Sequence, residues 1–420
     1  MEFSVSSVSS GSSVSAIAPG HGAGLPFGAV RKYQNASVGL PFCVVRACIW
    51  TLIGGSITNT WIGSGQSGIG RILVVGGGLS RTDITSAGAI DNITVKAIVV
   101  HYDDGVPDLS GGDIESSTIT AGEAGIGRIS FTGGDLCDAS IVSAGPIGSI
   151  VGSAVVLHYQ DEAPGVLGGN IIRTTIKAGD QAIGRIALRG GCLGSETDHI
   201  EIDCGLLGAV SVRGIRYLYD TTEIPMLDRH GCARTSYTGN RLVRISPEYG
   251  MAGGEAWMNL KSAGKVDSIR VAGGALGGKI EAAGGIGEIR LRSVALVKPG
   301  HYMGIPCVAS DYQITVADLL ADIVVGSGNG RQSIGSISLH GGSIVGDVNA
   351  AGTIGRIRAT GYGIIDTNYN EPELNGATIL SKNFNSTGIK VLHLVMPHAK
   401  AAPVDEYPYS GGLVTICVGG

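Results

Sequence analysis

The sequence predicts an all-β fold: a parallel β-helix, or β-solenoid, of about ten coils, with hairpin arms on alternate coils. A short kernel, two aliphatic residues three positions apart after a glycine-rich turn, occurs ten times. Glycine doublets at 54–55, 111–112 and 168–169 recur at an interval of 57 residues. Glycine supplies 70 of 420 residues while aromatic residues make up only 5%. This composition suits a narrow, repetitive interior filled by small β-branched side chains.

The kernels define the coils. They begin at Ile69, Ile90, Ile126, Ile147, Ile183, Leu207, Val266, Ile286, Ile334 and Ile354. The first four spacings alternate between 21 and 36 residues, starting with 21. The 21-residue unit at 126–146 contains two short runs of alternating polarity between glycine-rich corners, which predicts short strands joined by tight bends. About 20 residues is typical of one β-helix coil, so strands of successive coils should pair and equivalent isoleucines should stack inside.

The 36-residue units carry inserts that predict the arms. The first two inserts, at 99–112 and 156–169, have an apolar limb, a polar tip and a return limb, which is a hairpin pattern. Later inserts begin at Arg216, Val294 and Thr360. One arm arises per two coils, and a hairpin is as wide as two coils are tall, about 9.6 Å. We therefore expect neighbouring arms to abut edge to edge as a further sheet.

The two ends of the chain differ from the repeat and divide it into three regions. Residues 1–53 form an N-terminal arm and cap, 54–360 the solenoid with its arms, and 361–420 a C-terminal cap with a terminal strand. The first region combines a Ser/Val tract at 3–17 with an apolar stretch at 42–53, either a strand or a helical turn, that would cap the open end. The last apolar run, 413–418, predicts a strand.

Charge and cysteine usage exclude several classes of protein. A net charge of −5 gives no basic field to attract nucleic acid. The sequence contains no run of 18 apolar residues, so no membrane span is predicted. The N-terminus has no readable secretory signal. The eight cysteines lack the CxxC spacing of zinc modules. Cys137 and Cys192 are two coils apart, which favours buried free thiols over a disulfide. We expect no cofactor and no metal ion.

An arginine column is one candidate binding site. Arg71, Arg128 and Arg185 each occupy the third position of a kernel, and Arg356 has the same place in a later copy. Asn92 and Ser149 lie between them. Such a stripe is suited to an anionic polysaccharide or to carboxylates of a neighbouring subunit. The alternative interpretation is an outward strand face kept soluble by charge.

The tips of the first two arms form the second candidate. They combine histidine, tyrosine and carboxylate, a set that can bind a metal or exchange protons: His101, Tyr102, Asp103, His158, Tyr159 and Asp161. Equivalent residues of neighbouring arms would be about 9.6 Å apart, too far to share a metal ion. Contacts to a partner, or simple packing within the arms, are the other interpretations.

No catalytic residues are assigned from the sequence. Polysaccharide lyases and hydrolases with this fold gather carboxylates on one face. Here Asp83, Asp113, Asp135, Asp138 and Asp203 are dispersed over different coils.

The repeated IxAGxIGxI pattern with Gly-Gly corners, over roughly residues 54–360, resembles right-handed parallel β-helix proteins of the pectin-lyase-like superfamily. It is similar in particular to their glycine-rich surface and adhesin-like members. The resemblance implies the solenoid fold, and it leaves activity open because members include lyases, hydrolases, adhesins and inert scaffolds.

These observations favour a non-enzymatic structural protein that assembles head to tail with copies of itself into extracellular fibres or a surface layer. The Ser/Val tract and the strand at 413–418 are candidate connectors that pair with a neighbour's edge. A carbohydrate-active enzyme or a polysaccharide-binding protein is the alternative, with polysaccharide as the partner. An extracellular or cell-surface location is expected, with cytoplasm or a viral particle as alternatives.

Overall fold

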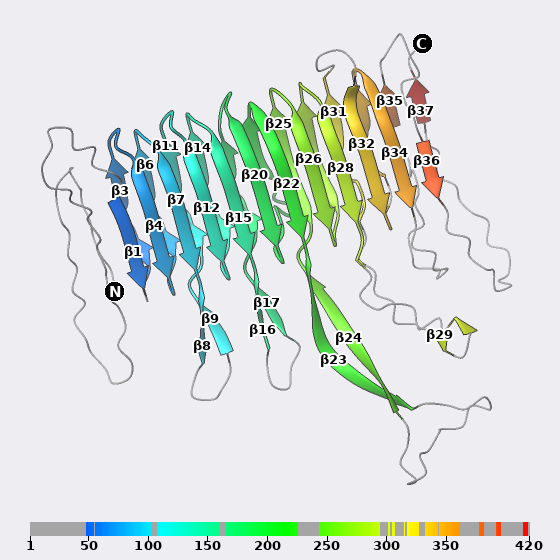
Figure 1. Ribbon diagram of the computed structural model, residues 1–420, viewed down its shortest axis with the longest axis horizontal. Coiled ribbons are helices and arrows are strands. Elements are labelled where there is room, and N and C mark those ends of the chain that lie inside the picture. Colours follow the sequence, from blue (N-terminus) through cyan, green and yellow to red (C-terminus); the bar gives the residue numbers. More distant parts are fainter. Residues whose placement is uncertain are drawn as a thin grey trace, which may run out of the picture.

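The computed structural model of the chain describes residues 48–53, 55–101, 107–158, 164–225, 243–294, 301–302, 305–306, 315, 317–326, 332–342, 344–360, 378–381, 392–395 and 415–418. All regular elements in these ranges are strands, which confirms the predicted parallel β-helix (Figure 1). No described segment is a helix with the length and apolarity needed to cross a membrane.

One long parallel sheet, here called the kernel sheet, contains all ten kernels. It has 12 strands that follow one another in chain order along the rod (Figure 1). They are β1 (Cys48–Ile53), β4 (Ile69–Val75), β7 (Ile90–Lys96), β12 (Ile126–Thr132), β15 (Ile147–Ser153), β20 (Ala182–Arg189), β22 (Leu206–Arg213), β26 (Val266–Ala272), β28 (Ile286–Arg292), β32 (Gln332–His340), β34 (Thr353–Thr360) and β36 (Leu392–Val395).

A second long sheet and a short sheet close the coils. The second sheet consists of β3 (Trp61–Ser64), β6 (Asp83–Ser86), β11 (Thr118–Ala121), β14 (Ser140–Ser143), β19 (Thr175–Lys177), β21 (Ile200–Cys204), β25 (Ala256–Ser262), β27 (Leu276–Ala282), β31 (Asp322–Val325), β33 (Val348–Ala350), β35 (Thr378–Ser381) and β37 (Thr415–Val418). The short sheet consists of β2 (Ile57–Thr58), β5 (Leu79–Ser80), β10 (Ile114–Glu115), β13 (Leu136–Cys137) and β18 (Ile171–Ile172). Single bridges through Leu193, Leu319 and Ile344 continue this third face.

The interior is a set of stacked aliphatic columns. The first residue of every kernel pairs with the first residue of the next, from Ile69 to Ile354, without a break in register. None of these ten side chains is more than 2% exposed. Because each buried aliphatic side chain contributes about 1.5–3 kcal/mol, the columns are the main stabilising element of the rod. The predicted isoleucine ladders are confirmed.

Glycine doublets mark the points where the chain re-enters a coil from an arm. Gly111 and Gly112 have φ angles of +77° and +100°, in the left-handed region that favours glycine. A Cβ atom on Gly111 would lie 2.3 Å from the backbone nitrogen of Gly77 in the preceding coil. The doublets 168–169 and 253–254 have the same positive φ angles after the next two arms. A glycine doublet therefore marks the return of each of these three arms, and the 57-residue interval separates the first two returns.

Hairpin arms leave every second coil, as predicted. They are β8 (Ile98–His101) with β9 (Pro107–Ser110), β16 (Val155–Leu157) with β17 (Gly165–Leu167), β23 (Ile215–Pro225) with β24 (Val243–Ala252), and β29 (His301–Tyr302) with β30 (Ile305–Pro306). The last predicted arm begins at Thr360, and residues 361–377 lie outside the described residues. Each described arm is a separate two-stranded sheet, so the prediction that arms pair edge to edge is wrong. Two-stranded ribbons twist strongly, which turns their edges away from one another, and Figure 1 shows the arms splayed.

Both predicted end segments contain strands that belong to the chain's own solenoid. In the stretch 42–53, β1 is a strand that pairs in parallel with β4 and so forms the first rung of the kernel sheet. In the segment 413–418, β37 pairs in parallel with β35 of the same chain. One edge of this strand therefore pairs within its own chain, and the expected pairing with a neighbour stays a prediction for its other edge. The Ser/Val tract lies outside the described residues.

Candidate functional site

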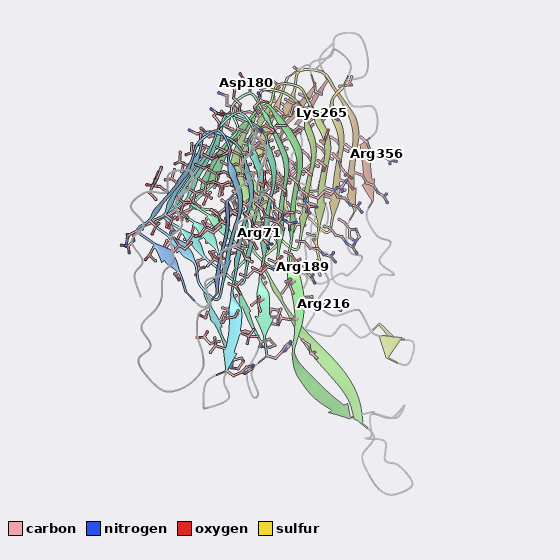
Figure 2. All side chains as sticks on the ribbon, turned by 60° about the vertical axis from the view of Figure 1, so that its left-hand side comes forward. Arg71, Asp180, Arg189, Arg216, Lys265 and Arg356 are labelled. Carbon is pink, nitrogen blue, oxygen red and sulfur yellow. The ribbon has the colours of Figure 1, made fainter. Side chains whose placement is uncertain are left out.

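The structure places the arginine column where the sequence predicted it. Kernel positions are numbered from the first aliphatic residue, and the arginines occupy position 3. Arg71, Arg128 and Arg185 are exposed, and Asn92 and Ser149 separate them in register. Figure 2 shows Arg71 and Arg356 far apart along the rod. Successive members of the first three are two strands apart, about 9.6 Å, so they act as isolated cations.

A denser set of arginines was not recognised from the sequence. Positions 5 and 7 of the later kernels face the same side as position 3 and carry Arg189, Arg213, Arg270, Arg290, Arg292, His340 and Arg358. Their signal was the period of two within IGEIRLR, where positions 5 and 7 are basic, and within IGRIRAT, where positions 3 and 5 are basic. Aligning only the kernel itself concealed this signal.

The arm tips are not brought together by the described residues. His101 ends β8 and is exposed, and His158 follows β16 and is also exposed. They belong to different hairpins with no hydrogen bond between the two sheets. Tyr102, Asp103, Tyr159 and Asp161 lie outside the described residues.

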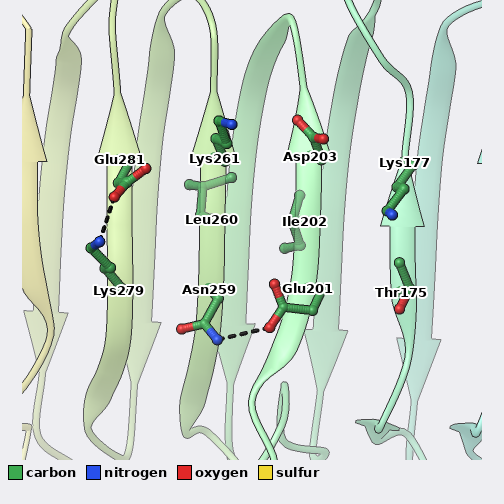
Figure 3. A pocket seen from close by; sticks show the side chains of 10 residues that line it. All are labelled: Thr175, Lys177, Glu201, Ile202, Asp203, Asn259, Leu260, Lys261, Lys279 and Glu281. Carbon is green, nitrogen blue, oxygen red and sulfur yellow. Dashed lines mark hydrogen bonds and ion pairs between the residues drawn. The ribbon is translucent and has the colours of Figure 1, made fainter.

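A concave surface on the second sheet gathers polar side chains, of which the sequence analysis had named only Asp203. It encloses about 410 Å³ over β19, β21, β25 and β27 (Figure 3). Its lining residues are Thr175, Lys177, Glu201, Ile202, Asp203, Asn259, Leu260, Lys261, Lys279 and Glu281. One row across the strands alternates in charge, with Lys177, Asp203, Lys261 and Glu281 in register.

The groups in this groove bind mainly to one another. Asn259 Nδ2 donates a hydrogen bond of 2.8 Å to Glu201 Oε1, and Lys279 Nζ lies 2.6 Å from Glu281 Oε1. The hydrogen bond and charge of Lys279 lower the pKa of Glu281. A general acid of a glycosidase needs the opposite shift, because it must hold a proton near neutral pH. The groove therefore has the chemistry of a self-neutralised polar surface.

Carboxylates at the edge of the short sheet connect coils. Asp113 Oδ1 accepts a hydrogen bond of 2.8 Å from the backbone nitrogen of Asp135. Asp135 Oδ1 accepts two of 2.9 Å from Asn170, and Asn170 Oδ1 accepts one of 2.8 Å from the backbone nitrogen of Cys192. Burial is the main cause that raises the pKa of Asp113. Two of the dispersed aspartates, Asp113 and Asp135, thus form a ladder with Asn170 that has a structural role.

Cys137, Cys192 and Cys204 are free thiols, as expected for the first two, and Cys137 is protected from ionisation. Cys204 is buried, whereas Cys137 and Cys192 are half-buried, so the expected burial of this pair is only partial. Burial, and then the negative charges of Asp138 and Glu115, raise the pKa of Cys137 to about 11. The reactive thiolate is therefore scarce at neutral pH.

Metal ligands and known relatives give no further assignment. Among the residues that the structure describes, no three His, Cys, Asp or Glu side chains are placed to hold a metal ion. The chain matches no protein-family model, no curated protein and no solved structure.

Proposed function

We propose that the chain is a non-enzymatic structural protein whose solenoid subunits stack head to tail into fibres or a surface layer outside the cell. The observation that carries this proposal is the state of the terminal strands. Within the described ranges, β1 and β36 of the kernel sheet, and β3 and β37 of the second sheet, are each hydrogen-bonded along one edge only. An edge strand presents a row of backbone N–H and C=O groups that can pair with another chain.

The direction of the strands supports continuation by a second copy. Every pair in the two long sheets is parallel, from β1 to β36 and from β3 to β37. A second copy in the same orientation would therefore extend both sheets with the same register. A head-to-tail contact of this kind does not close on itself and generates an open filament.

Electron microscopy and light scattering of the purified full chain test the proposal. The wild-type protein is expected to form filaments whose mass increases with concentration. The double variant Leu394→Pro, Ile416→Pro should lose them, because proline removes a backbone donor from the terminal strands β36 and β37. The control Ala401→Pro changes the segment between these strands and should still form filaments.

Two results would contradict the proposal. A wild-type protein that stays a monodisperse monomer at all concentrations has no head-to-tail contact. Equal loss of filaments in the control would mean that the strands themselves are not the connectors. Circular dichroism of each variant checks that the solenoid is retained.

A further inference from the structure

Seven basic side chains on the later half of the kernel sheet form two groups, on β20 with β22 and on β28 with β32 and β34, here together called the basic track. They are Arg189, Arg213, Arg290, Arg292, His340, Arg356 and Arg358. At position 7, Arg189, Arg213, Ala272, Arg292 and His340 are consecutive partners in register. Four steps between neighbouring strands span about 19 Å parallel to the axis of the rod. Figure 2 shows Arg189 near the bases of the arms.

Nearby acids do not neutralise the track. The acidic residues at positions 2 and 3 of these kernels are Asp267 and Glu288. Asp267 Oδ1 lies 2.7 Å from Lys265 Nζ, and Glu288 Oε2 lies 2.8 Å from Arg270 Nη2. Both acids therefore neutralise cations outside the track. Among the described residues, no arginine of the track has an ion pair within 4.0 Å.

Like charges also face each other across neighbouring strands. Arg189 is the direct partner of Arg213, and Arg270 is the direct partner of Arg290. Like charges placed directly opposite in a sheet destabilise it. A bound polyanion would offset this repulsion. Other coils have serine at these positions and avoid the repulsion without any ligand.

Several arginines of the neighbouring strands influence the charge state of His340. Burial is the main cause that lowers the pKa of its imidazole, followed by the charges of Arg292, Arg358 and Arg290. Arg290 and Arg292 lie on one neighbouring strand, β28, and Arg358 lies on the other, β34. The positive field is therefore concentrated between three strands.

We propose that the basic track binds a linear acidic polysaccharide that lies along the rod. Arginine forks bind carboxylate and sulfate oxygens in pairs of hydrogen bonds, and a row of them suits a partner with charges at regular intervals. Single-stranded nucleic acid is usually bound with aromatic stacking platforms. Positions 3, 5 and 7 of β20, β22, β26, β28, β32 and β34 carry no Phe, Tyr or Trp.

Binding of polygalacturonate to the full chain, measured by calorimetry at low and moderate salt, tests this site. The wild-type protein should bind, and the affinity should fall as salt rises. The variant Arg290→Ser, Arg292→Ser, Arg358→Ser should bind at least about tenfold more weakly at low salt, since it removes three of the charge-assisted contacts. The matched control Arg71→Ser, Lys96→Ser, Arg128→Ser removes the same charge from the earlier half and should change affinity less than about twofold, because these cations are isolated.

Further binding measurements distinguish an acidic polysaccharide from other classes of partner. Heparin should bind to the same track, because its sulfates offer the same paired acceptors, and dextran, a neutral polysaccharide, should not bind. Equal weakening by both triple variants would reduce the effect to net charge and overturn the proposal. Tighter binding of single-stranded DNA than of either glycan would assign the track to nucleic acid. Salt-sensitive side-by-side association without glycan, lost in the first variant, would assign it to a second copy. No binding of any probe by folded protein would also overturn it, whether or not filaments form end to end.

Discussion

The two halves of the kernel sheet have the same interior and different exteriors. In β4, β7, β12 and β15 the inward side chains form the same buried columns as in β20 to β34. Outside, the earlier half spaces Arg71, Lys96 and Arg128 among uncharged residues, whereas the later half places arginines on adjacent strands. The interior is constrained because each side chain must match its equivalents in the coils on both sides. The exterior needs only to be soluble, so it is free to acquire a specific surface.

The largest expected effect tests whether the interior is truly shared. Ile129 in the earlier half and Ile337 in the later half hold the same kernel position and are both 0% exposed. Replacing either by alanine should lower the free energy of unfolding by roughly 2–5 kcal/mol, because each leaves a cavity between stacked coils. Urea unfolding followed by circular dichroism measures the loss. A much smaller loss at Ile337 would show that the later half is less tightly packed, and the comparison would fail.

A smaller effect tests whether acids limit the charge of the later half. Glu288→Gln removes the partner of Arg270 and leaves its guanidinium without a carboxylate within the described surface. The exposed pair contributes at most about 1 kcal/mol to folding, so the variant should remain folded. Its affinity for polygalacturonate should rise severalfold at low salt and converge with wild type at high salt. The control Glu281→Gln changes the charge of the second sheet by the same amount and should leave affinity unchanged.

The solenoid was predictable because its signal is repeated. A single IGRI would be weak evidence, but ten copies, the first five of which alternate in spacing between 21 and 36 residues, fix the coil length and the position of the arms. Paired glycines with positive φ then mark the return of each arm. The separation of the arms was not predictable, because the spacing argument contained the width of a hairpin and not its twist.

The candidate sites were less predictable because they depend on residues that do not repeat. The column through Arg71, Arg128 and Arg185 was found from its 57-residue period. Arg290 and Arg358 have no such period, and only the register through Ser338 makes them neighbours across one strand. The groove on the second sheet depends in the same way on pairs such as Glu201 with Asn259. A residue type alone does not indicate such pairs.

The smallest expected effect is a pH dependence that belongs to the later half alone. His340 lies on β32 between β28 and β34, and the charges of Arg292, Arg358 and Arg290 on those strands act on it. Burial first, and then these charges, hold its pKa below the ordinary value of 6.5. As pH falls from 7 towards 5, the unfolded chain therefore takes up the proton before the folded chain does, and the free energy of unfolding falls. Below the folded pKa this contribution becomes constant.

The effect is isolated by comparing urea midpoints at pH 7 and pH 5 in the wild type and in His340→Gln. The glutamine variant should lose less stability over this range, by an amount small beside the alanine substitutions in the core. Arg358→Ser should reduce the wild-type pH dependence in part, because it removes one of the charges that disfavour the imidazolium ion. Lys96 holds the kernel position of His340 in the earlier half, and Lys96→Ser should leave the pH dependence unchanged. An identical pH dependence in all four proteins would mean that the arginines do not act on His340, and the contrast between the two halves would then rest on composition alone.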